Sequence, residues 1–428
     1  MKKQLIKILC GLVVVPVICT TSCTKNYTST SSVPLSAAFS SPQAMAEVAV
    51  GLQRTYTLGR GSSLYNHVTI NGLLTSELIV LNQGNTGEYQ LQLGAGNVDG
   101  TNTLAAGLWT TSNKIIFDAD NLRSGAANLG DKGYASGIIA YADYFKALAL
   151  GDLAMFWEKV PTSTGKNVTF ADRSQGYTMA MAAIDEALNA VTANPISATF
   201  LFNIPPGIDI VNSLHALRAR YLVFTGKYPE ALAEAAIPSQ TIKSTFTFAT
   251  ATLNPIYETA TSTNNVTAVS SITTLGLPAG LQPNPADQRL PFYTNTAPGS
   301  QIKGFAAAPT TPWPVYLPGE MTLIRAEAYA RQNDLVNGLA ELNKVVTKQP
   351  ASDIYGVGAG LPPVAGLTQA QLLDEIYKQR CIELFMSGFK LEDMRRFGRP
   401  NSEKKRNFLP YPFLERDNNT NTPPDPAF

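Results

Sequence analysis

Residues 376–398 read IYKQRCIELFMSGFKLEDMRRFG, and this stretch decides the fold. Its apolar residues recur at helical spacing, and charged residues are set among them. Four charged residues and one glycine stand out: Arg380, Glu383, Gly388, Asp393 and Arg396. Arg380 and Glu383 lie one turn apart and can pair on a helix, while Gly388 can end that helix and let the later charges fold back. We interpret these charges as a structural set and not as a catalytic one.

The same stretch resembles the C-terminal signature of the SusD/RagB family. In that family an Arg, a Glu-Leu pair, a Gly, a basic residue, an Asp and an Arg recur at these spacings. The matching positions are Arg380, Glu383, Leu384, Gly388, Lys390, Asp393 and Arg396. Two positions depart from the pattern, because Ser387 stands where an acid is usual and Lys390 where Arg is usual. The resemblance extends to residues 134–161, 287–289 and 326–328.

Helical periodicity outside the signature predicts an all-α fold made of helix pairs. The predicted helical blocks are residues 42–56, with Ser41 as N-cap and Pro42 in the first turn; 134–149; 177–191; 213–235, broken at 225–229; and 321–348, broken near 333–334. The pairs within 134–235 and 321–348 resemble tetratricopeptide hairpins, in which a Gly-x-Tyr turn leads into an Ala-rich second helix.

Residues 237–318 differ in composition from the helical blocks that flank them. They are rich in Thr, Ser, Asn, Pro and Gly and lack long periodic runs, so we expect loops and short strands there. Recognition loops are commonly carried on a rigid scaffold in this way. We therefore predict one helical domain over residues 42–428, with this loop-rich segment as its ligand region.

The N-terminus has the three parts of a bacterial lipoprotein signal. Lysines come first, residues 8–17 are apolar, and small residues precede Cys23. The apolar run is shorter than the roughly 20 residues that a membrane span needs. We predict a signal peptide over residues 1–22, acyl chains such as palmitate on Cys23, and a flexible Ser/Thr-rich linker over residues 23–41. Thr20 stands where Leu is usual, so ordinary signal-peptidase cleavage stays an alternative.

Composition narrows the class of partner and the redox chemistry. Hydrophobic residues make up 44% of the chain, and 33 basic residues balance 32 acidic ones, which gives no electrostatic footprint for nucleic acid. A neutral ligand fits this balance better. Cys10 and Cys19 leave with the signal peptide and Cys23 takes lipid, so Cys381 is the only remaining thiol and no internal disulfide is expected.

Patterns for catalysis and metal binding are weak. His67 and His215 have no Cys or acid neighbours at metal-ligand spacing, so no metal site is predicted, and His215 is interpreted as a structural helix residue. The glycines at residues 94–96 and 356–358 lack the strand and helix of a phosphate loop. A carboxylate pair for glycoside hydrolysis is a spatial arrangement that the sequence does not reveal.

The family resemblance implies a function. Members bind glycans at the outer face of a Gram-negative outer membrane, cap a TonB-dependent transporter and pass oligosaccharides into it; some bind calcium. We therefore expect a non-enzymatic, cell-surface lipoprotein whose partners are an oligosaccharide and a SusC-like TonB-dependent transporter. The alternatives are a surface glycoside hydrolase, and a transporter lid that handles peptides or other non-glycan ligands.

Sugar capture needs aromatic faces and planar polar side chains. We looked for aromatic residues in segments that the sequence predicts to be irregular. The candidates are Tyr89, which stands near Asn82, Gln83 and Asn85, followed by Trp109, Tyr257, Tyr293 and Trp313. Trp157 lies beside Phe156 within residues 134–161, where the family resemblance is strong, and is predicted to be core.

Overall fold

The computed structural model describes residue 39, residues 41–261 and residues 265–428. The predicted signal peptide, Cys23 and all but the end of the predicted linker lie outside the described residues. Ser41–Phe428 form one compact unit. No helix in the described part of the chain is long and apolar enough to cross a membrane.

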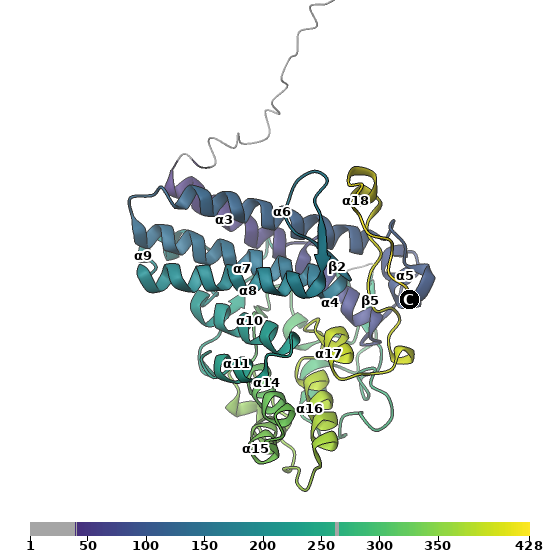
Figure 1. The fold of residues 1–428 in the computed structure, drawn as a ribbon. Coiled ribbons are helices and arrows are strands. Elements are labelled where there is room, and N and C mark those ends of the chain that lie inside the picture. Colours follow the sequence, from purple (N-terminus) through teal and green to yellow (C-terminus); the bar gives the residue numbers. More distant parts are fainter. Residues whose placement is uncertain (1–38, 40, 262–264) are drawn as a thin grey trace, which may run out of the picture. The chain divides into compact units, whose positions relative to one another are not determined.

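The described chain is mainly helical, which confirms the predicted fold class (Figure 1). The helices are α3 (Pro42–Thr57), α4 (Ser63–Leu74), α5 (Thr86–Leu93), α6 (Thr103–Ala126), α7 (Lys132–Phe156), α8 (Arg173–Ala193), α9 (Ala198–Asn203), α10 (Ile210–Phe224), α11 (Tyr228–Glu234), α12 (Pro255–Thr261), α13 (Arg289–Tyr293), α14 (Pro318–Arg331), α15 (Leu335–Val346), α16 (Gln369–Glu383), α17 (Lys390–Arg396) and α18 (Phe413–Asn418). The strands are β1 (Leu78–Val80), β2 (Lys159–Pro161), β3 (Phe170–Asp172), β4 (Thr245–Phe246), β5 (Thr267–Val269) and β6 (Trp313–Pro314).

Successive helices pack side by side in a long series. The long helices α3, α6, α7 and α8 contact one another, and α10 continues the stack through α8. The series goes on through α11, α14, α15 and α16, which step away from the long helices in Figure 1. Each helix covers the apolar face of the one before it, which is how hairpin repeats build a continuous core.

The predicted start of the first helix and the two predicted helix breaks are confirmed. The Ser41 side chain accepts a hydrogen bond of 3.1 Å from the Ala44 amide at the start of α3, and Pro42 occupies the first turn. The break at residues 225–229 separates α10 from α11, and the break near 333–334 separates α14 from α15. Both predicted hairpins are therefore present.

Helices α4, α5 and α6 are not predicted by the sequence patterns. Helix α6 carries Thr, Ser, Asn and Asp along its length, and these residues favour turns and caps when taken alone. Its buried positions nevertheless follow helical spacing, as Leu108, Ser112, Ile115 and Ala119 show. Tertiary burial of that face against α7 and α3 outweighs the low local propensity.

The loop-rich segment at residues 237–318 contains the predicted loops and short strands, together with α12 and α13. All three sheets in the described residues are antiparallel and two-stranded, and they pair β1 with β5, β2 with β3 and β4 with β6. In the β4–β6 pair, Phe246 lies opposite Trp313. The β1–β5 pair connects this segment to the chain that follows α4.

A network of buried charges holds the C-terminal signature in place. Arg289 lies 2.7 Å from Asp287 and 3.0 Å from Glu383, and all three side chains are fully buried. Glu383 also accepts a bond of 2.6 Å from Lys348. Buried carboxylates of this kind are tolerated only when cations and donors surround them. The network therefore joins α13, α16 and the chain after α15.

The signature pairs differently from the sequence-based interpretation. Arg380 bonds Asp393 at 2.8 Å and not Glu383, whose partners come from other elements. The predicted fold-back onto the helix is therefore confirmed for Asp393, whereas Arg396 bonds Asp393 within α17 and Glu327 on α14. Gly388 does not end α16, which stops at Glu383; it lies in the turn before α17 with φ of +85°.

We predict that Arg289→Met lowers the free energy of unfolding by about 3–5 kcal/mol, because it leaves two carboxylates in the core without their guanidinium partner. The control is Lys114→Met, which removes an ion pair to Asp118 from a side chain that is 58% exposed; that loss should stay below about 1 kcal/mol. Urea unfolding of both variants measures the difference. Equal losses would contradict the structural role of the network.

We predict that Gly388→Ala is more costly than Gly398→Ala, although both glycines have positive φ. A Cβ at Gly388 would lie 2.1 Å from Cδ2 of His67, whereas a Cβ at Gly398 meets nothing within 4 Å. Both variants carry a backbone cost of about 1–2 kcal/mol, and only the first adds an overpacking cost of about 1–3 kcal/mol. Thermal unfolding separates the two, and matching midpoints would show that the turn does not pack on α4.

Candidate functional site

The structure places only one of the five predicted ligand aromatics outside a helix. Tyr89 lies on α5, Trp109 on α6, Tyr257 on α12 and Tyr293 on α13, while Trp313 lies on β6. The expectation that they stand in irregular segments is wrong for the four helical ones. Trp109, Tyr293 and Trp313 are buried, whereas Tyr89 and Tyr257 are half-buried. Their contact with a ligand stays a prediction, and the accessible pair is the better placed for it.

Trp109 packs inside an aromatic cluster. Its ring centroid lies 4.9 Å from that of Trp157 and 5.7 Å from that of Tyr411, and Phe170 stacks on it. Its indole N–H donates to Glu415 at 3.1 Å. A ring covered in this way has no face left for a sugar, so the core contacts explain Trp109. Trp157, the residue predicted to be core, is fully buried in the same cluster.

Tyr293 and Trp313 fasten the loop-rich segment to the scaffold. The Tyr293 hydroxyl donates at 2.5 Å to the backbone carbonyl of Glu383, and its ring packs against Phe305 and Phe385. Trp313 is 6% exposed, and its centroid lies 6.3 Å from that of Phe305. Both side chains therefore act as loop anchors in this structure.

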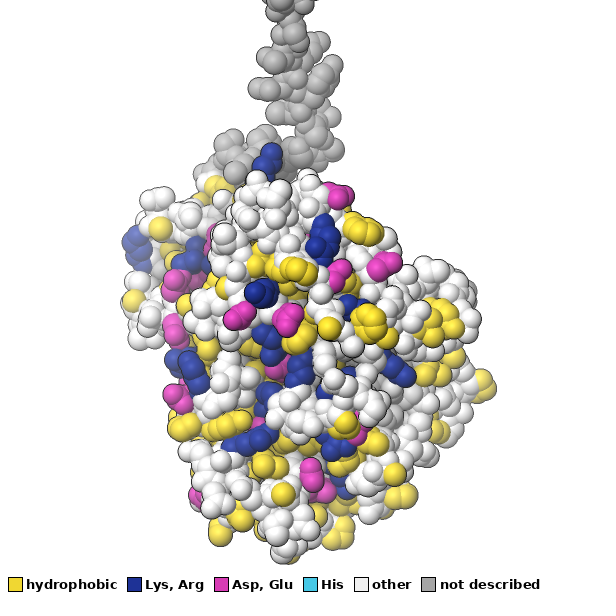
Figure 2. All heavy atoms as spheres, turned by 45° about the vertical axis from the view of Figure 1, so that its right-hand side comes forward, with side chains coloured by type: hydrophobic (Ala, Val, Ile, Leu, Met, Phe, Trp, Pro, Cys, Tyr) yellow, Lys and Arg dark blue, Asp and Glu magenta, His cyan; other side chains and the backbone are white. Residues whose placement is uncertain are grey.

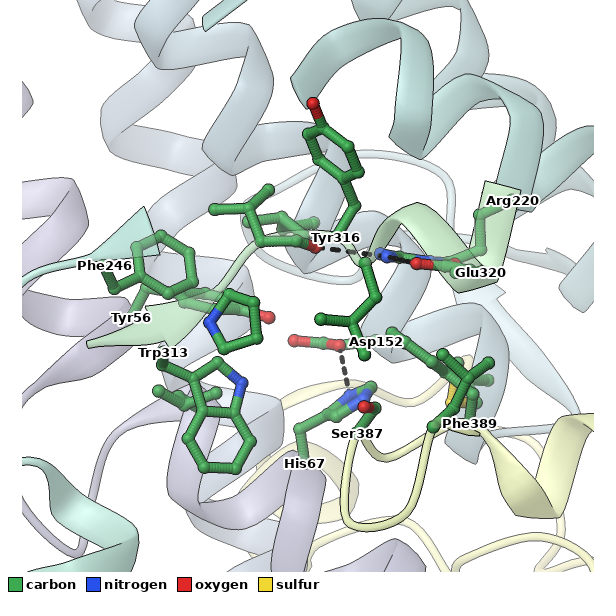
Figure 3. A pocket seen from close by; sticks show the side chains of 18 of the residues that line it. Tyr56, His67, Asp152, Arg220, Phe246, Trp313, Tyr316, Glu320, Ser387 and Phe389 are labelled. Carbon is green, nitrogen blue, oxygen red and sulfur yellow. Dashed lines mark hydrogen bonds and ion pairs between the residues drawn. The ribbon is translucent and has the colours of Figure 1, made fainter. Parts of the chain in front are cut away.

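Trp313 also lines a small internal cavity, shown in Figure 3. The cavity measures about 50 Å³, while ligand pockets commonly measure about 300–1,000 Å³. On its walls the Asp152 carboxyl meets His67 at 2.8 Å, and Arg220 meets Glu320 at 2.5 Å. The second Asp152 oxygen has no hydrogen-bond partner among the described residues. The cavity suits an ordered water and excludes a sugar ring.

His215 has the predicted structural role on a helix. His215 lies on α10, and its Nδ1 is 2.6 Å from Glu234. Among the described residues, no group of three or more His, Cys, Asp or Glu side chains is arranged to hold a metal ion.

The accessible candidate tyrosine Tyr89 belongs to a polar surface that we call the α5 surface. It consists of Arg60, Asn82, Gln83, Asn85 and Tyr89. Arg60 is 44% exposed, Asn82 and Gln83 are exposed, and Asn85 and Tyr89 are half-buried. The surface combines an aromatic ring with a guanidinium and three amides, which are the planar groups that hydrogen-bond sugar hydroxyls.

Local hydrogen bonds fix the α5 surface. The Tyr89 amide donates to the carbonyl of Asn85 at 3.0 Å, which places the two side chains one turn apart. Arg60 donates to Asn85 at 2.9 Å and to Glu88 at 2.7 Å. Glu88 is itself buried and accepts a further bond of 2.8 Å from Tyr65. The guanidinium is thus held in one orientation before a ligand arrives, which lowers the entropy cost of binding.

The second accessible tyrosine, Tyr257, lies on a neighbouring element. Its helix α12 packs against α4 and β5, while α5 packs against α4 and β1. Strand β1 thus contacts α5 and strand β5 contacts α12. Ile79 of β1 is 38% exposed, and Leu81, which follows β1, is 43% exposed. Because they are two positions apart in extended chain, both side chains point to one side, which leaves apolar surface at this sheet.

Charge is sparse in the loop-rich segment. The segment 237–318 holds five charged residues, and two of them, Asp287 and Arg289, are buried in the network described above. Figure 2 shows acidic and basic side chains intermixed over the visible face, with no large field of one sign. Such a surface suits a neutral, hydroxyl-rich ligand.

A second hollow region lies along α6, α7 and α8. Its two parts measure about 600 and 320 Å³ and share Asp120 and Glu186. Their charged groups already pair, since Lys146 lies 2.6 Å from Asp120 and Arg123 contacts Glu186. No aromatic side chain lines either part. The region therefore lacks the stacking face that the α5 surface offers.

Comparison with known proteins adds a clear structural relationship. No protein-family model and no curated protein sequence matches the chain. The fold resembles a SusD superfamily protein from Bacteroides thetaiotaomicron at 16% identity, with a TM-score of 0.69 over 90% of this chain and 100% of the other. It also resembles a laminarin-binding SusD-like protein at 16% identity, with a TM-score of 0.60 over 90% and 99%.

A third similar structure is a SusD-like carbohydrate-binding protein from Bacteroides fragilis, at 14% identity and a TM-score of 0.63 over 84% of this chain and 87% of the other. The similarity extends over 84–90% of this chain in the three comparisons, so it concerns the fold as a whole. The resemblance seen in residues 376–398 is confirmed at the level of the fold: the chain has the SusD-like fold.

Proposed function

We propose that the protein is a non-enzymatic, cell-surface lipoprotein of the SusD/RagB family that captures an oligosaccharide and delivers it to a TonB-dependent transporter of the outer membrane. The observation that carries the proposal is the α5 surface, with Tyr89 set beside four planar polar side chains on a SusD-like scaffold. Two proteins of similar fold are described as laminarin-binding and carbohydrate-binding.

The chemistry of the α5 surface supports binding over hydrolysis. Glycoside hydrolysis uses two carboxyl groups about 5–10 Å apart, one on each side of the scissile bond. The carboxylate adjoining this surface is Glu88, which is 1% exposed and engaged by Arg60 and Tyr65. It is held as a structural acceptor, and the remaining members of the surface carry no acid. We therefore propose that the ligand leaves this site unchanged.

The transporter partner and the lipid attachment to the membrane are proposed from the sequence. Cys23 follows small residues at the end of an apolar run, and two or more acyl chains on it would hold a protein stably at a membrane. A lipid tether would keep the binding protein in the same membrane as its transporter. Tethering raises the local concentration of captured ligand at that transporter. Calcium remains a proposal from the family resemblance alone.

We predict that Tyr89→Ala and Tyr257→Ala each weaken polysaccharide binding about tenfold, because truncation of an aromatic anchor costs about 1–2 kcal/mol. Tyr89→Phe should keep most of the affinity, since it keeps the ring face. Affinity electrophoresis against a panel that includes laminarin gives the measurement.

The matched control is Phe202→Ala on α9, an aromatic side chain that is 89% exposed and distant in sequence from the α5 surface. It should bind as the unaltered protein does. If the three alanine variants behave alike while the unaltered protein is retarded, the ligand lies elsewhere. New reducing ends after incubation would establish a hydrolase instead.

We predict that Cys23→Ser moves the protein from the membrane fraction to the soluble fraction, because the acyl chains can no longer be attached. Mass measurement of the mature N-terminus of the unaltered protein should show the added acyl chains. A mature N-terminus without lipid would support ordinary signal-peptidase cleavage and contradict the anchor. Co-purification with a barrel protein without retardation by any polysaccharide would favour a lid for non-glycan ligands.

A further inference from the structure

An apolar surface lies at one end of the helical stack, and we call it the α9 surface. It consists of Leu201, Phe202, Val211, Ile237 and Ile242, which are 37–89% exposed. These residues come from α9, from the start of α10 and from the loop that follows α11. Apolar surface that is exposed and continuous usually marks a contact with a protein or a membrane.

Contacts between these segments make the α9 surface continuous. Leu201, Val211 and Lys243 line one open hollow of about 580 Å³, whose other walls are mostly apolar. The Ser239 amide donates to the side chain of Asn212 at 2.8 Å, which holds the loop after α11 against the start of α10. The hollow shares no residue with the α5 surface.

The apolar residues of α9 are held outward by the fold. The helix starts at a cap, where the Phe200 amide donates to the Ser197 hydroxyl at 3.2 Å. Phe200 is fully buried, and its ring centroid lies 5.4 Å from that of Tyr134 and 6.1 Å from that of Tyr141. Because Phe200 is fixed in the core, the residues after it turn outward, and Phe202 is 89% exposed.

The α9 surface lies at the end of the molecule where the predicted linker joins it. Helix α9 contacts α3, which begins at Pro42 directly after that linker. Figure 1 shows α9 at the end of the long helices where α3 begins. A flexible linker of about 17 residues would average roughly 20–25 Å between its ends. The other end of α7, a helix of 25 residues, lies about 38 Å further away. A bilayer that holds Cys23 is therefore nearest to the α9 end.

The charges beside the α9 surface favour a lipid headgroup region. The charged residues that line its hollow are Asp209 and Lys243. The Asp209 carboxylate caps α10 and accepts from the amide and the side chain of Asn212 at 3.0 and 2.9 Å. Lys243 is exposed, and its ammonium lies 5.5 Å from the centre of the Tyr355 ring, a contact that leaves its charge in place. Apolar side chains beside an exposed ammonium suit the interface of an anionic membrane.

We propose that the α9 surface inserts into the interfacial region of the lipid bilayer, beside the anchored N-terminus. The proposal rests on the lipid anchor proposed above. The acyl chains on Cys23 hold the protein, and the α9 surface fixes its orientation without being able to retain it alone. Figure 1 shows α5 at the opposite end of the long helices from α9. This orientation would direct the α5 surface away from the bilayer.

The test places a polarity-sensitive fluorophore on the α9 surface. The mature chain is held on vesicles of phosphatidylethanolamine and phosphatidylglycerol by a histidine tag in place of Cys23, through a nickel-chelating lipid. Phe202→Cys supplies the labelling site, because the remaining thiol, Cys381, is buried. We expect a blue shift of the emission and quenching by lipids with doxyl-labelled acyl chains. Leu414→Cys on α18, at a residue that is 68% exposed, is the control and should show neither.

Other occupants give different results. Equal quenching at positions 202 and 414, or no quenching at position 202, would overturn the proposal. An emission shift that depends on protein concentration and not on doxyl lipid would show that a second copy covers the surface, which also overturns it. An unquenched label that responds only when the transporter is in the vesicle would show a protein partner and would overturn it as well.

A charge variant tests the surface without a label on Phe202. With the fluorophore on Ile242→Cys, quenching should be lost in Phe202→Asp, because a carboxylate is costly to move into an apolar environment. Phe202→Leu should keep the quenching. Both variants should unfold at the temperature of the unaltered protein, since the side chain is exposed. Quenching that survives Phe202→Asp would overturn the proposal.

The tag separates this proposal from the anchor on which it rests. Mass measurement of the natural N-terminus tests the anchor, and the tagged protein on vesicles tests the α9 surface. A natural N-terminus without lipid would contradict the anchor alone, whereas an unquenched label at position 202 would contradict the α9 surface alone.

Discussion

The fold depends on one buried ionic contact, in which Arg289 meets Asp287 and Glu383 with all three side chains removed from water. Glu383 ends α16 and also holds Lys348, while its backbone carbonyl accepts the Tyr293 hydroxyl. Each carboxylate would be costly alone, so the elements that supply cations must assemble together. The contact therefore couples the C-terminal helices to the loop-rich segment, which has little regular structure of its own.

The residues that make this contact and its surroundings are engaged in the core, and a different set of side chains is exposed and available to a ligand. The charged residues of the signature are used within the core, and the buried aromatic residues Trp109, Tyr293 and Trp313 pin segments to the helical stack. Rigid attachment of this kind lets the exposed side chains keep one geometry. On the α5 surface, Arg60 is already oriented by Glu88 and Asn85. The proposed binding there would require little reorganisation, which preserves affinity in a small interface.

Much of the fold was predictable because its signals are local. Ser41 and Pro42 mark a helix start, the break at 225–229 marks a hairpin, and residues 376–398 indicate the SusD-like fold. Helix α6 was not predicted, because its Thr, Ser and Asn residues lower the local helix propensity. Its buried face can be recognised only from its packing against α7. The pairing of Glu383 with Arg289 could not be predicted from local patterns either, since the two residues are 94 positions apart in sequence. Of the candidate ligand residues, Tyr89 is accessible, whereas the burial of Trp109 is a property of tertiary packing that no local pattern shows.

The central claim is that a rigid SusD-like scaffold presents the α5 surface to a saccharide. Hydrogen–deuterium exchange of the whole protein, with and without a polysaccharide that retards it in affinity gels, tests this most directly. The account predicts slower exchange over residues 79–93 and 255–261 and unchanged, slow exchange over residues 376–398. Protection confined to the region along α6, α7 and α8, or no protection at the α5 surface under saturating ligand, would contradict it.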